Sequence, residues 1–292
     1  MFENPIDAKK QVLKDKHTLL EGYITEYLYE KQFLFSTSTK YTSGWWSAEV
    51  NDQIFFFVVS ESLNDVDKAV TGVLSKQYPV WRAYPEEDTW YFQNGETRLD
   101  LGQFLSEYHL QEPRDTRAAD EKTRDYVRQI KCVSFFEAHG ILKKIAIERN
   151  FANFFLTNCF DSLVNIDYII QKRNGQLCAI EVKFKNESSN GTFGINAGQL
   201  RMFGLLEQLG FEIQHWILYK GANNKKNISI FDFLEQKRKK WWRFGVICPS
   251  DVEGNGKTAP KETSVNGFKV QEYYEFDASN FKFKAPLDVS LD

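Results

Sequence analysis

The sequence predicts a fold that mixes helices and strands, in the α/β or α+β class. Apolar residues recur at helical spacing among charges over 5–32, whereas Ser, Thr and aromatic residues dominate 33–60 and end in a strand-like run. The chain has 292 residues, 42% of them hydrophobic, which is enough for one large domain or two ordinary ones. We therefore expect both kinds of element in a globular protein with more than one domain.

The first third of the chain, residues 1–112, predicts a separate α+β domain. Its strand-like run is interrupted at Gly44 and at Asn51-Asp52, which favours a hairpin. A helix, two strands and a second helix are expected next, near 64–76, 79–84, 89–101 and 101–109, with a turn at Asn94-Gly95. The polar stretch 111–120 contains a proline and marks the expected domain boundary.

The segment 120–138 predicts a helix that carries one unusual carboxylate. Its apolar residues recur at Tyr126, Ile130 and Val133, and Glu137 continues the same steps onto the apolar face. Two interpretations stay open for Glu137. It is either a helix-end glutamate that bends out to solvent or a functional carboxylate.

The most informative segment is 165–185, where two β-branched runs flank a short loop that ends in Gly175. A three-residue hairpin loop commonly ends with glycine in the left-handed conformation, and this loop fixes the strand register. In that register Asp167 lies directly opposite Glu181. Strand alternation then sets both carboxylates and Lys183 on one polar face, and leaves the other face apolar.

Two carboxylates that face each other across strands repel unless a cation lies between them. Oxygen ligands favour Mg²⁺, and Mn²⁺ is expected to substitute for it. Such an ion can coordinate a phosphate oxygen, lower the pKa of a bound water and stabilise the transition state of phosphodiester hydrolysis. The alternative is a solvated hairpin face on which Lys183 simply offsets Asp167 and Glu181.

In its order of elements the chain resembles the PD-(D/E)XK nuclease superfamily, which includes restriction endonucleases, RecB-type exonucleases and Holliday-junction resolvases. The resemblance covers roughly residues 120–222: a helix, a strand, the hairpin with Asp167 and Glu181-Val182-Lys183, a helix with Gln199, and a strand. It implies a restriction-endonuclease-like core, in which helices flank a mixed central β-sheet.

The resemblance also implies roles for the matching residues. Asp167 and Glu181 match the metal-binding carboxylates, and the backbone carbonyl of Val182 matches a further metal ligand. Lys183 matches the lysine that positions or polarises the attacking water. Glu137 is similar to the acidic residue that many members carry on a helix.

The sequence departs from the family pattern at two positions. Ile166 stands where the proline that names the motif would precede Asp167, and Phe203 follows Gln199 where RecB-like members have tyrosine. Gln199 therefore has two interpretations, a contact to metal-bound water or DNA and a polar residue at a helix N-terminus. Glu148 is the reserve candidate for the third carboxylate.

Basic charge is concentrated in one part of the chain. Residues 170–245 carry 13 basic and 6 acidic side chains, a net charge of +7, whereas residues 1–112 carry 10 and 18, a net charge of −8. DNA is therefore expected to bind around 170–245. The residues expected to contact it are Lys185, Asn196, Arg201, Lys237, Arg238, Lys240, Trp241 and Arg243.

Two segments of this basic region have alternative interpretations. The run 237–243 interleaves cations with flat rings, as phosphate contact with base stacking requires, or else forms a solvated helix end whose tryptophans pack inward. The Gly-, Ser- and Asn-rich segment 186–198 is expected to be a loop, which either approaches the nucleic-acid backbone through its amides or is a mobile surface loop.

The sequence shows no sign of a membrane or secretory protein. No apolar run approaches the roughly 18 residues of a membrane span, and residues 1–11 lack the apolar segment of a signal peptide. The four cysteines are too scattered for a disulfide framework or a metal site, and the four histidines form no visible cluster. We therefore expect a cytoplasmic protein that does not bind a membrane.

Together these observations predict a Mg²⁺-dependent DNA endonuclease, restriction-like or defence-related, with a nuclease domain over 113–245 and a C-terminal appendage over 246–292. Residues 1–112 would be a recognition, dimerisation or effector-sensing domain, whose negative charge disfavours a main role in DNA binding, and a homodimer is expected because cutting both strands needs two active centres. The alternatives are a nuclease activated by a small molecule or protein at 1–112, and a catalytically silent nuclease fold that binds nucleic acid.

Overall fold

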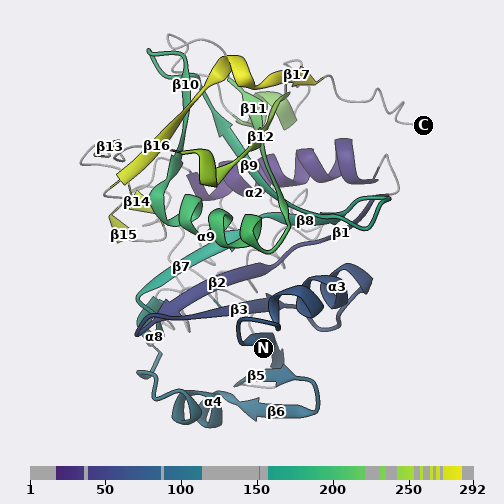
Figure 1. Cartoon of the computed structure of the whole chain (residues 1–292), viewed down its shortest axis with the longest axis vertical. Coiled ribbons are helices and arrows are strands. Elements are labelled where there is room, and N and C mark those ends of the chain that lie inside the picture. The colour runs from purple at the N-terminus through teal and green to yellow at the C-terminus, as the bar shows by residue number, and fades with distance from the viewer. Residues whose placement is uncertain are drawn as a thin grey trace. The chain divides into compact units, whose positions relative to one another are not determined.

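The computed structural model of the chain (Figure 1) describes residues 18–35, 39–86, 89–113, 151, 157–220, 230–234, 242–252, 257–258, 264–265, 268–269 and 272–284. The mixed α and β class predicted from the sequence is confirmed, with several sheets and few helices. Within these ranges, no helix has both the length and the apolar character needed to cross a membrane.

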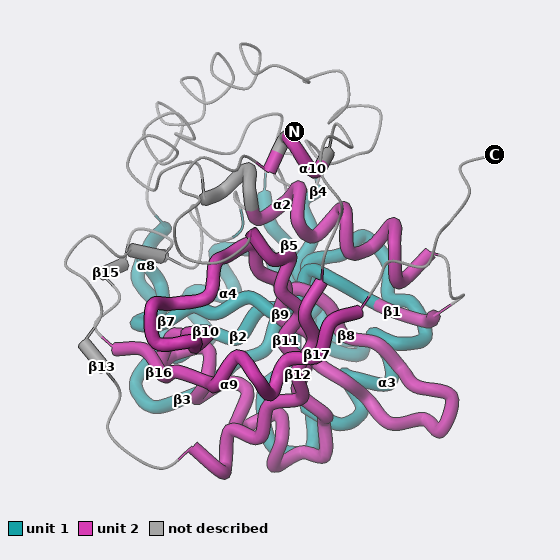
Figure 2. The backbone as a smooth tube through the Cα atoms, turned by 90° about the horizontal axis from the view of Figure 1, so that it is seen from above, with its two compact units in different colours: residues 1–16, 42–166 teal, residues 17–41, 167–292 magenta. Residues whose placement is uncertain are grey.

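The chain divides into two compact units (Figure 2). Unit 1 takes in Met1–Lys16 and Thr42–Ile166, and unit 2 takes in His17–Tyr41 and Asp167–Asp292. The larger segment of unit 1, Thr42–Ile166, is therefore inserted into the sequence of unit 2, and the divisions differ from the boundaries near 113 and 246 that the sequence predicts. The reason is physical: periodicity identifies a helix or strand, but strand pairing between distant segments decides which sheet it joins.

The sheet of unit 1 has six strands in the order β6-β5-β4-β3-β2-β7. These are β2 Trp45–Val50, β3 Gln53–Val59, β4 Val80–Glu86, β5 Thr89–Asn94, β6 Thr97–Asp100 and β7 Ser162–Ile166. The helices of unit 1 are α3 Asp65–Leu74, α4 Leu101–Glu107 and the short α8 Thr157–Cys159. Because β3 and β4 pair in parallel, the chain needs a crossover between them, and α3 lies in that connection.

Local sequence signals explain the turns and helix starts of unit 1. Asn51 and Asp52 both have positive φ, 49° and 61°, as the tight hairpin between β2 and β3 requires. The turn at Asn94-Gly95 is confirmed, with β5 and β6 paired on either side of it. Helix α3 begins with a capping box in which Asn64 and Asp67 satisfy each other's backbone N–H groups. The hairpin and both helices expected here are confirmed.

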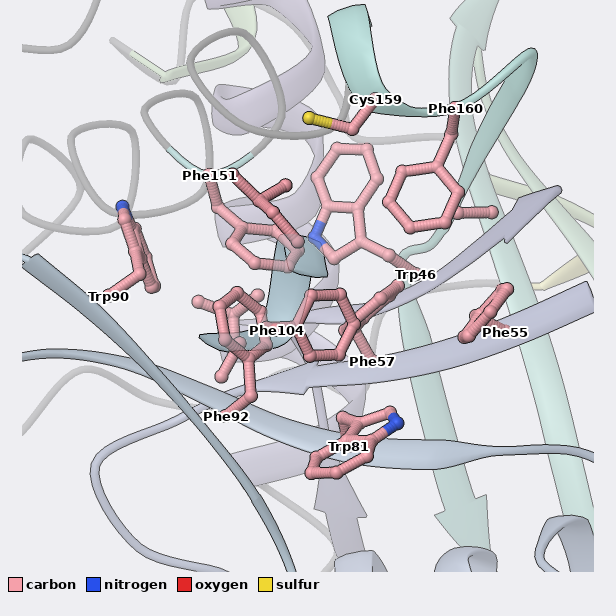
Figure 3. Close-up of a cluster of buried hydrophobic side chains, with 14 residues drawn as sticks. Trp46, Phe55, Phe57, Trp81, Trp90, Phe92, Phe104, Phe151, Cys159 and Phe160 are labelled. Atoms are coloured by element: carbon pink, nitrogen blue, oxygen red, sulfur yellow. The ribbon is translucent and has the colours of Figure 1, made fainter. Parts of the chain in front are cut away.

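Aromatic side chains form the core of unit 1 (Figure 3). Phe57 lies at the centre of the cluster, with edge-to-face contacts to Phe92, Phe104, Phe151 and Phe160 at ring-centroid distances of 5.5–6.1 Å. Such pairs add to the stability gained from area burial alone. The abundance of phenylalanine and tryptophan in the sequence is therefore used to fill this core.

The sheet of unit 2 also has six strands, in the order β1-β8-β9-β11-β12-β17. These are β1 Lys40–Thr42, β8 Tyr168–Gln171, β9 Leu177–Lys185, β11 Glu212–Tyr219, β12 Trp242–Ile247 and β17 Lys282–Lys284. Strands β9 and β11 are parallel, whereas β8 pairs with β9, and β12 with β11 and β17, in antiparallel fashion. The sheet is thus mixed.

Two helices cover opposite faces of this sheet (Figure 1). Helix α2, Thr18–Tyr29, continues as the π-helix η1, Glu30–Leu34, and packs Tyr29 and Phe33 against Trp216. Helix α9, Ala197–Gln208, brings Gln199 to Glu181, which points away from the face that holds Trp216. The helix predicted over 5–32 is therefore confirmed from Thr18 onward, and it belongs to unit 2.

The remaining elements of unit 2 lie around this sheet. They are β10 Thr192–Asn196, α10 Ile230–Leu234, η4 Pro249–Asp251, β13 Lys257–Thr258, β14 Ser264–Val265, β15 Phe268–Lys269, β16 Glu272–Asp277 and η5 Ala278–Asn280. Strand β10 pairs with β16, so the segment 186–198 is not wholly a loop as predicted. The expected C-terminal appendage contributes β17 directly to the main sheet.

Candidate active site

The hairpin of β8 and β9 has the register that the sequence predicts. Tyr168 pairs with Ile180 and Gln171 with Leu177, which sets Asp167 opposite Glu181 at the open end of the hairpin. Gly175 has a φ of 85°, and its N–H donates to the Lys172 carbonyl over 2.9 Å. A left-handed glycine therefore closes the loop, as expected from the sequence.

Asp167 directly precedes β8 and is only 4% exposed. Its Oδ2 accepts a hydrogen bond of 2.7 Å from the backbone N–H of Val182 on the neighbouring strand. This contact turns the carboxylate toward β9. Asp167 and the strand that carries Glu181 are thereby held together by the hairpin itself.

Glu181 is fully buried and is the centre of the polar cluster. Its Oε1 accepts a hydrogen bond of 2.5 Å from Gln199 Nε2 and forms an ion pair with Lys183. Its Oε2 is also buried and has no hydrogen-bond partner in the described part of the chain. Oε1 of Glu181 thus has two partners, and Oε2 is available to a ligand.

The electrostatics of the site follow from two buried carboxylates side by side. Burial, and then the charge of Glu181, raise the pKa of Asp167 well above its usual value, although Lys183 and the Val182 N–H oppose the change. Burial works to lower the pKa of Lys183, but the charges of Glu181 and Asp167 raise it more, so the net shift is upward. Lys183 therefore remains an ammonium, with its side chain 38% exposed.

Helix α2 adds a carboxylate that the sequence reasoning missed. The charge of Glu26 is among the lesser causes that raise the pKa of both Asp167 and Lys183. Tyr168 fixes the helix locally, because its hydroxyl donates to the Glu26 carbonyl over 3.1 Å. The order of elements could have indicated this helix. When the inserted segment 42–166 is set aside, α2 is followed by a strand, the hairpin, a helix and a strand.

The two glutamates predicted for this helix-borne role lie elsewhere in the sequence. Glu137 and Glu148 fall outside the residues that the structure describes, and so does the helix expected over 120–138. Gln199, in contrast, is buried near the start of α9 and bonds to Glu181. Gln199 is thus a polar residue near a helix N-terminus, as one interpretation had it, and it also contacts the carboxylate cluster; its contact to metal-bound water or DNA stays a prediction.

The predicted DNA-contact residues are distributed unevenly. Lys185 lies at the end of β9, donates to the Gly194 carbonyl, and has its pKa lowered to about 8 by burial and by the charge of Lys183. Asn196 is the residue before α9, and Arg201 is exposed on that helix. Lys237, Arg238, Lys240 and Trp241 lie outside the described residues.

Arg243 is built into the packing of unit 2. Its guanidinium lies 4.4 Å from the ring centroids of both Tyr219 and Phe283, and its ion pair with Glu187 spans 3.4 Å. Its side chain is 14% exposed. The sequence could not reveal this role, because the two rings and the carboxylate come from three separate segments.

His215 is a second residue whose position the sequence did not reveal. Strand β11 sets it beside Glu181 on the face that carries the carboxylates, and it is only 1% exposed. Burial first, and then the charges of Lys185 and Lys183, lower the pKa of His215 well below its usual value. The buried imidazole is therefore neutral.

The donor set of the cluster fits a hard divalent cation. Asp167 and Glu181 supply carboxylate oxygens, and the buried, unpartnered Oε2 of Glu181 is an oxygen that such an ion would satisfy. As they stand, the described side chains form no group of three or more His, Cys, Asp or Glu residues that could hold a metal. No protein-family model, curated protein or solved structure matches the chain.

Proposed function

We propose that this protein is a metal-dependent nuclease that hydrolyses phosphodiester bonds of DNA, with Mg²⁺ as its ion and an endonucleolytic mode of cutting. One observation carries the proposal: two buried carboxylates, a lysine and a glutamine meet at the open end of one hairpin. A buried pair of carboxylates is costly by itself, so a cluster of this kind favours a role that needs a bound cation.

The order of elements supports the same proposal. In unit 2, α2 is followed by β1, the β8–β9 hairpin, α9 and β11, which is the order that the nuclease resemblance requires. In this alignment Glu26 takes the part of the helix-borne acid, in place of Glu137. Asp167, Glu181 and Lys183 keep the parts that their sequence motif suggests.

Each residue then has a defined task. Asp167 and Glu181 would hold the ion, which when bound stabilises charge on the phosphate and lowers the pKa of a bound water. Lys183 keeps its proton, so its ammonium can orient the attacking water and offset negative charge as the bond to phosphorus forms. Gln199 holds the Oε1 side of Glu181 and fixes the orientation of that carboxylate.

The proposal is tested by a cleavage assay on supercoiled plasmid, linear duplex, single-stranded DNA and RNA, with Mg²⁺, Mn²⁺ or EDTA. An endonuclease converts supercoiled plasmid to nicked and linear forms. Asp167→Asn is expected to abolish cleavage, and Lys183→Ala to slow it by about 10²-fold or more, because each removes a group that acts in the transition state.

Lys172→Ala is the matched control. Lys172 lies in the same hairpin but pairs with Glu212 over 2.6 Å, away from the carboxylate cluster, so its loss should leave cleavage nearly unchanged. Cleavage that persists in EDTA, or that survives both site substitutions, would reject the proposal.

One observation favours a regulated form of the same activity. Asp167 directly follows β7, the last strand of unit 1, so the insertion joins the site through one peptide bond. A ligand or protein bound to unit 1 would thus act on a strand that is continuous with Asp167. This second candidate predicts that folded wild-type protein cleaves only after a compound that raises its melting temperature is added.

A further inference from the structure

Three buried polar atoms without hydrogen-bond partners gather at one point of the unit 2 sheet. Among the residues that the structure describes, no hydrogen-bond partner reaches Nδ1 or Nε2 of His215 or Oε2 of Glu181. The parallel register pairs His215 of β11 with Glu181 of β9, so the two side chains leave the same face of adjacent strands. Buried polar atoms are rarely left unpaired, and three together indicate an interaction that the site is built to make.

The surroundings keep the imidazole away from solvent. The ring of Phe281 meets that of His215 edge to face, with ring centroids 5.9 Å apart. Gly245 lies opposite His215 on β12, and a Cβ atom at Gly245 would come within 2.9 Å of the Phe281 ring. The glycine thus makes the room that lets Phe281 close over His215.

Packing alone does not explain a histidine at this position. An apolar residue would fill the same space without burying two ring nitrogens, and burial without a partner is unfavourable. A neutral imidazole offers one N–H donor and one acceptor. The free oxygen of Glu181, on the neighbouring strand, is a matching acceptor for that donor.

We propose that His215 is a positioning residue of the candidate site: its imidazole N–H donates to Oε2 of Glu181 through one buried water, and orients the carboxylate for a divalent cation. The inference rests on the proposed function, because it concerns the same carboxylate. Groups that hydrogen-bond to metal-binding carboxylates set their orientation, and their loss typically weakens metal binding by about 10–100-fold.

The first test is Mn²⁺ binding to the intact protein by isothermal titration calorimetry. His215→Phe is expected to weaken Mn²⁺ affinity by about 10–100-fold. His215→Gln, which keeps an N–H donor, should recover part of that loss. Gln214→Met is the matched control, because Gln214 is also buried but points to the opposite face, where it bonds to Trp216.

Melting temperature separates this role from a structural one. His215→Phe removes the donor to Glu181 but also a buried nitrogen that has no partner, so the metal-free variant should melt close to the wild-type temperature, while its metal affinity falls. If Glu181→Gln loses Mn²⁺ binding but His215→Phe binds as wild type does, the positioning role is overturned and the proposed nuclease site stands. If wild-type protein binds no Mn²⁺, the proposed metal site and this inference both fail.

A metal-free measurement tests the contact itself. In protein labelled with ¹⁵N-histidine, the side-chain nitrogen resonances of His215, assigned by their loss in His215→Phe, should move in Glu181→Gln and stay in place in Gln214→Met. Resonances that do not respond to Glu181→Gln would overturn the hydrogen bond, whatever the metal affinities are.

Discussion

At the scale of single residues, Asp167 and Glu181 oppose the stability of the metal-free fold. Both are buried, and each is near the negative charge of the other. The raised pKa of Asp167 means that its ionised form is less favourable in the folded protein than in the unfolded chain. Asp167 therefore makes a contribution to stability that is fully present below the usual aspartate pKa of 3.8 and is lost as pH rises through its raised folded-state pKa.

The first prediction concerns this penalty. In EDTA at neutral pH, Asp167→Asn should melt a few degrees above wild type, because it removes a buried charge but keeps an oxygen to accept from the Val182 N–H. The advantage should shrink as pH falls below 3.8, where Asp167 becomes protonated in the unfolded chain as well as in the folded protein. Melting curves across this pH range check it, and an asparagine variant that is equally or less stable at neutral pH would contradict it.

At the scale of elements, two glycines of unit 1 share a left-handed backbone but differ in their surroundings. Gly44, before β2, has a φ of 79°, and a Cβ there would come within 2.9 Å of the Val59 carbonyl oxygen. Gly95, in the β5–β6 turn, has a φ of 57° and open space around the same position. Gly44 also accepts a hydrogen bond from the Val59 N–H over 2.8 Å, which holds the two segments together.

The second prediction follows from that difference. Gly95→Ala should cost about 1–2 kcal/mol of unfolding free energy, which is the strain of a left-handed alanine. Gly44→Ala should cost a further 1–3 kcal/mol, roughly, because the backbone of Val59 must also move. Urea unfolding of both variants measures the gap. Equal destabilisation would show that the close approach to Val59 is relieved without cost.

At the scale of the whole molecule, charge is divided along the chain in a way that suits the proposed substrate. The net charge of the chain is −3, yet residues 170–245 carry a net charge of +7. That region supplies β9, α9 and β11, which carry Glu181, Lys183, Gln199 and His215. It also supplies part of β12, which pairs with β11. Counterion release depends on the phosphates neutralised locally, so a negative net charge does not oppose DNA binding.

The third prediction is a salt dependence. In EDTA, which prevents cleavage, the affinity for duplex DNA should fall between 50 and 200 mM salt, by roughly fortyfold if three phosphates are neutralised. Arg201→Ala, which removes an exposed cation from α9, should make this dependence less steep. Fluorescence anisotropy with labelled duplex measures both, and an affinity that does not change with salt would argue against phosphate contacts.

The sequence by itself determined the local features. The register of β8 and β9, the left-handed Gly175, the β2–β3 and β5–β6 hairpins and helices α3 and α4 were all predictable, because each depends on residues that are neighbours in the chain. The opposition of Asp167 and Glu181 follows from the same register. These features need no knowledge of the rest of the fold.

Only the tertiary structure decided which distant segments meet. The backbone carbonyl of Glu26 meets Tyr168 because α2 packs on the unit 2 sheet, and His215 lies beside Glu181 because β11 pairs in parallel with β9. Pairing between segments far apart in sequence is set by the burial of whole faces, which leaves no signal at any one residue. The same reason explains why Arg243 is enclosed by rings, and why the insertion of unit 1 was not visible in the sequence.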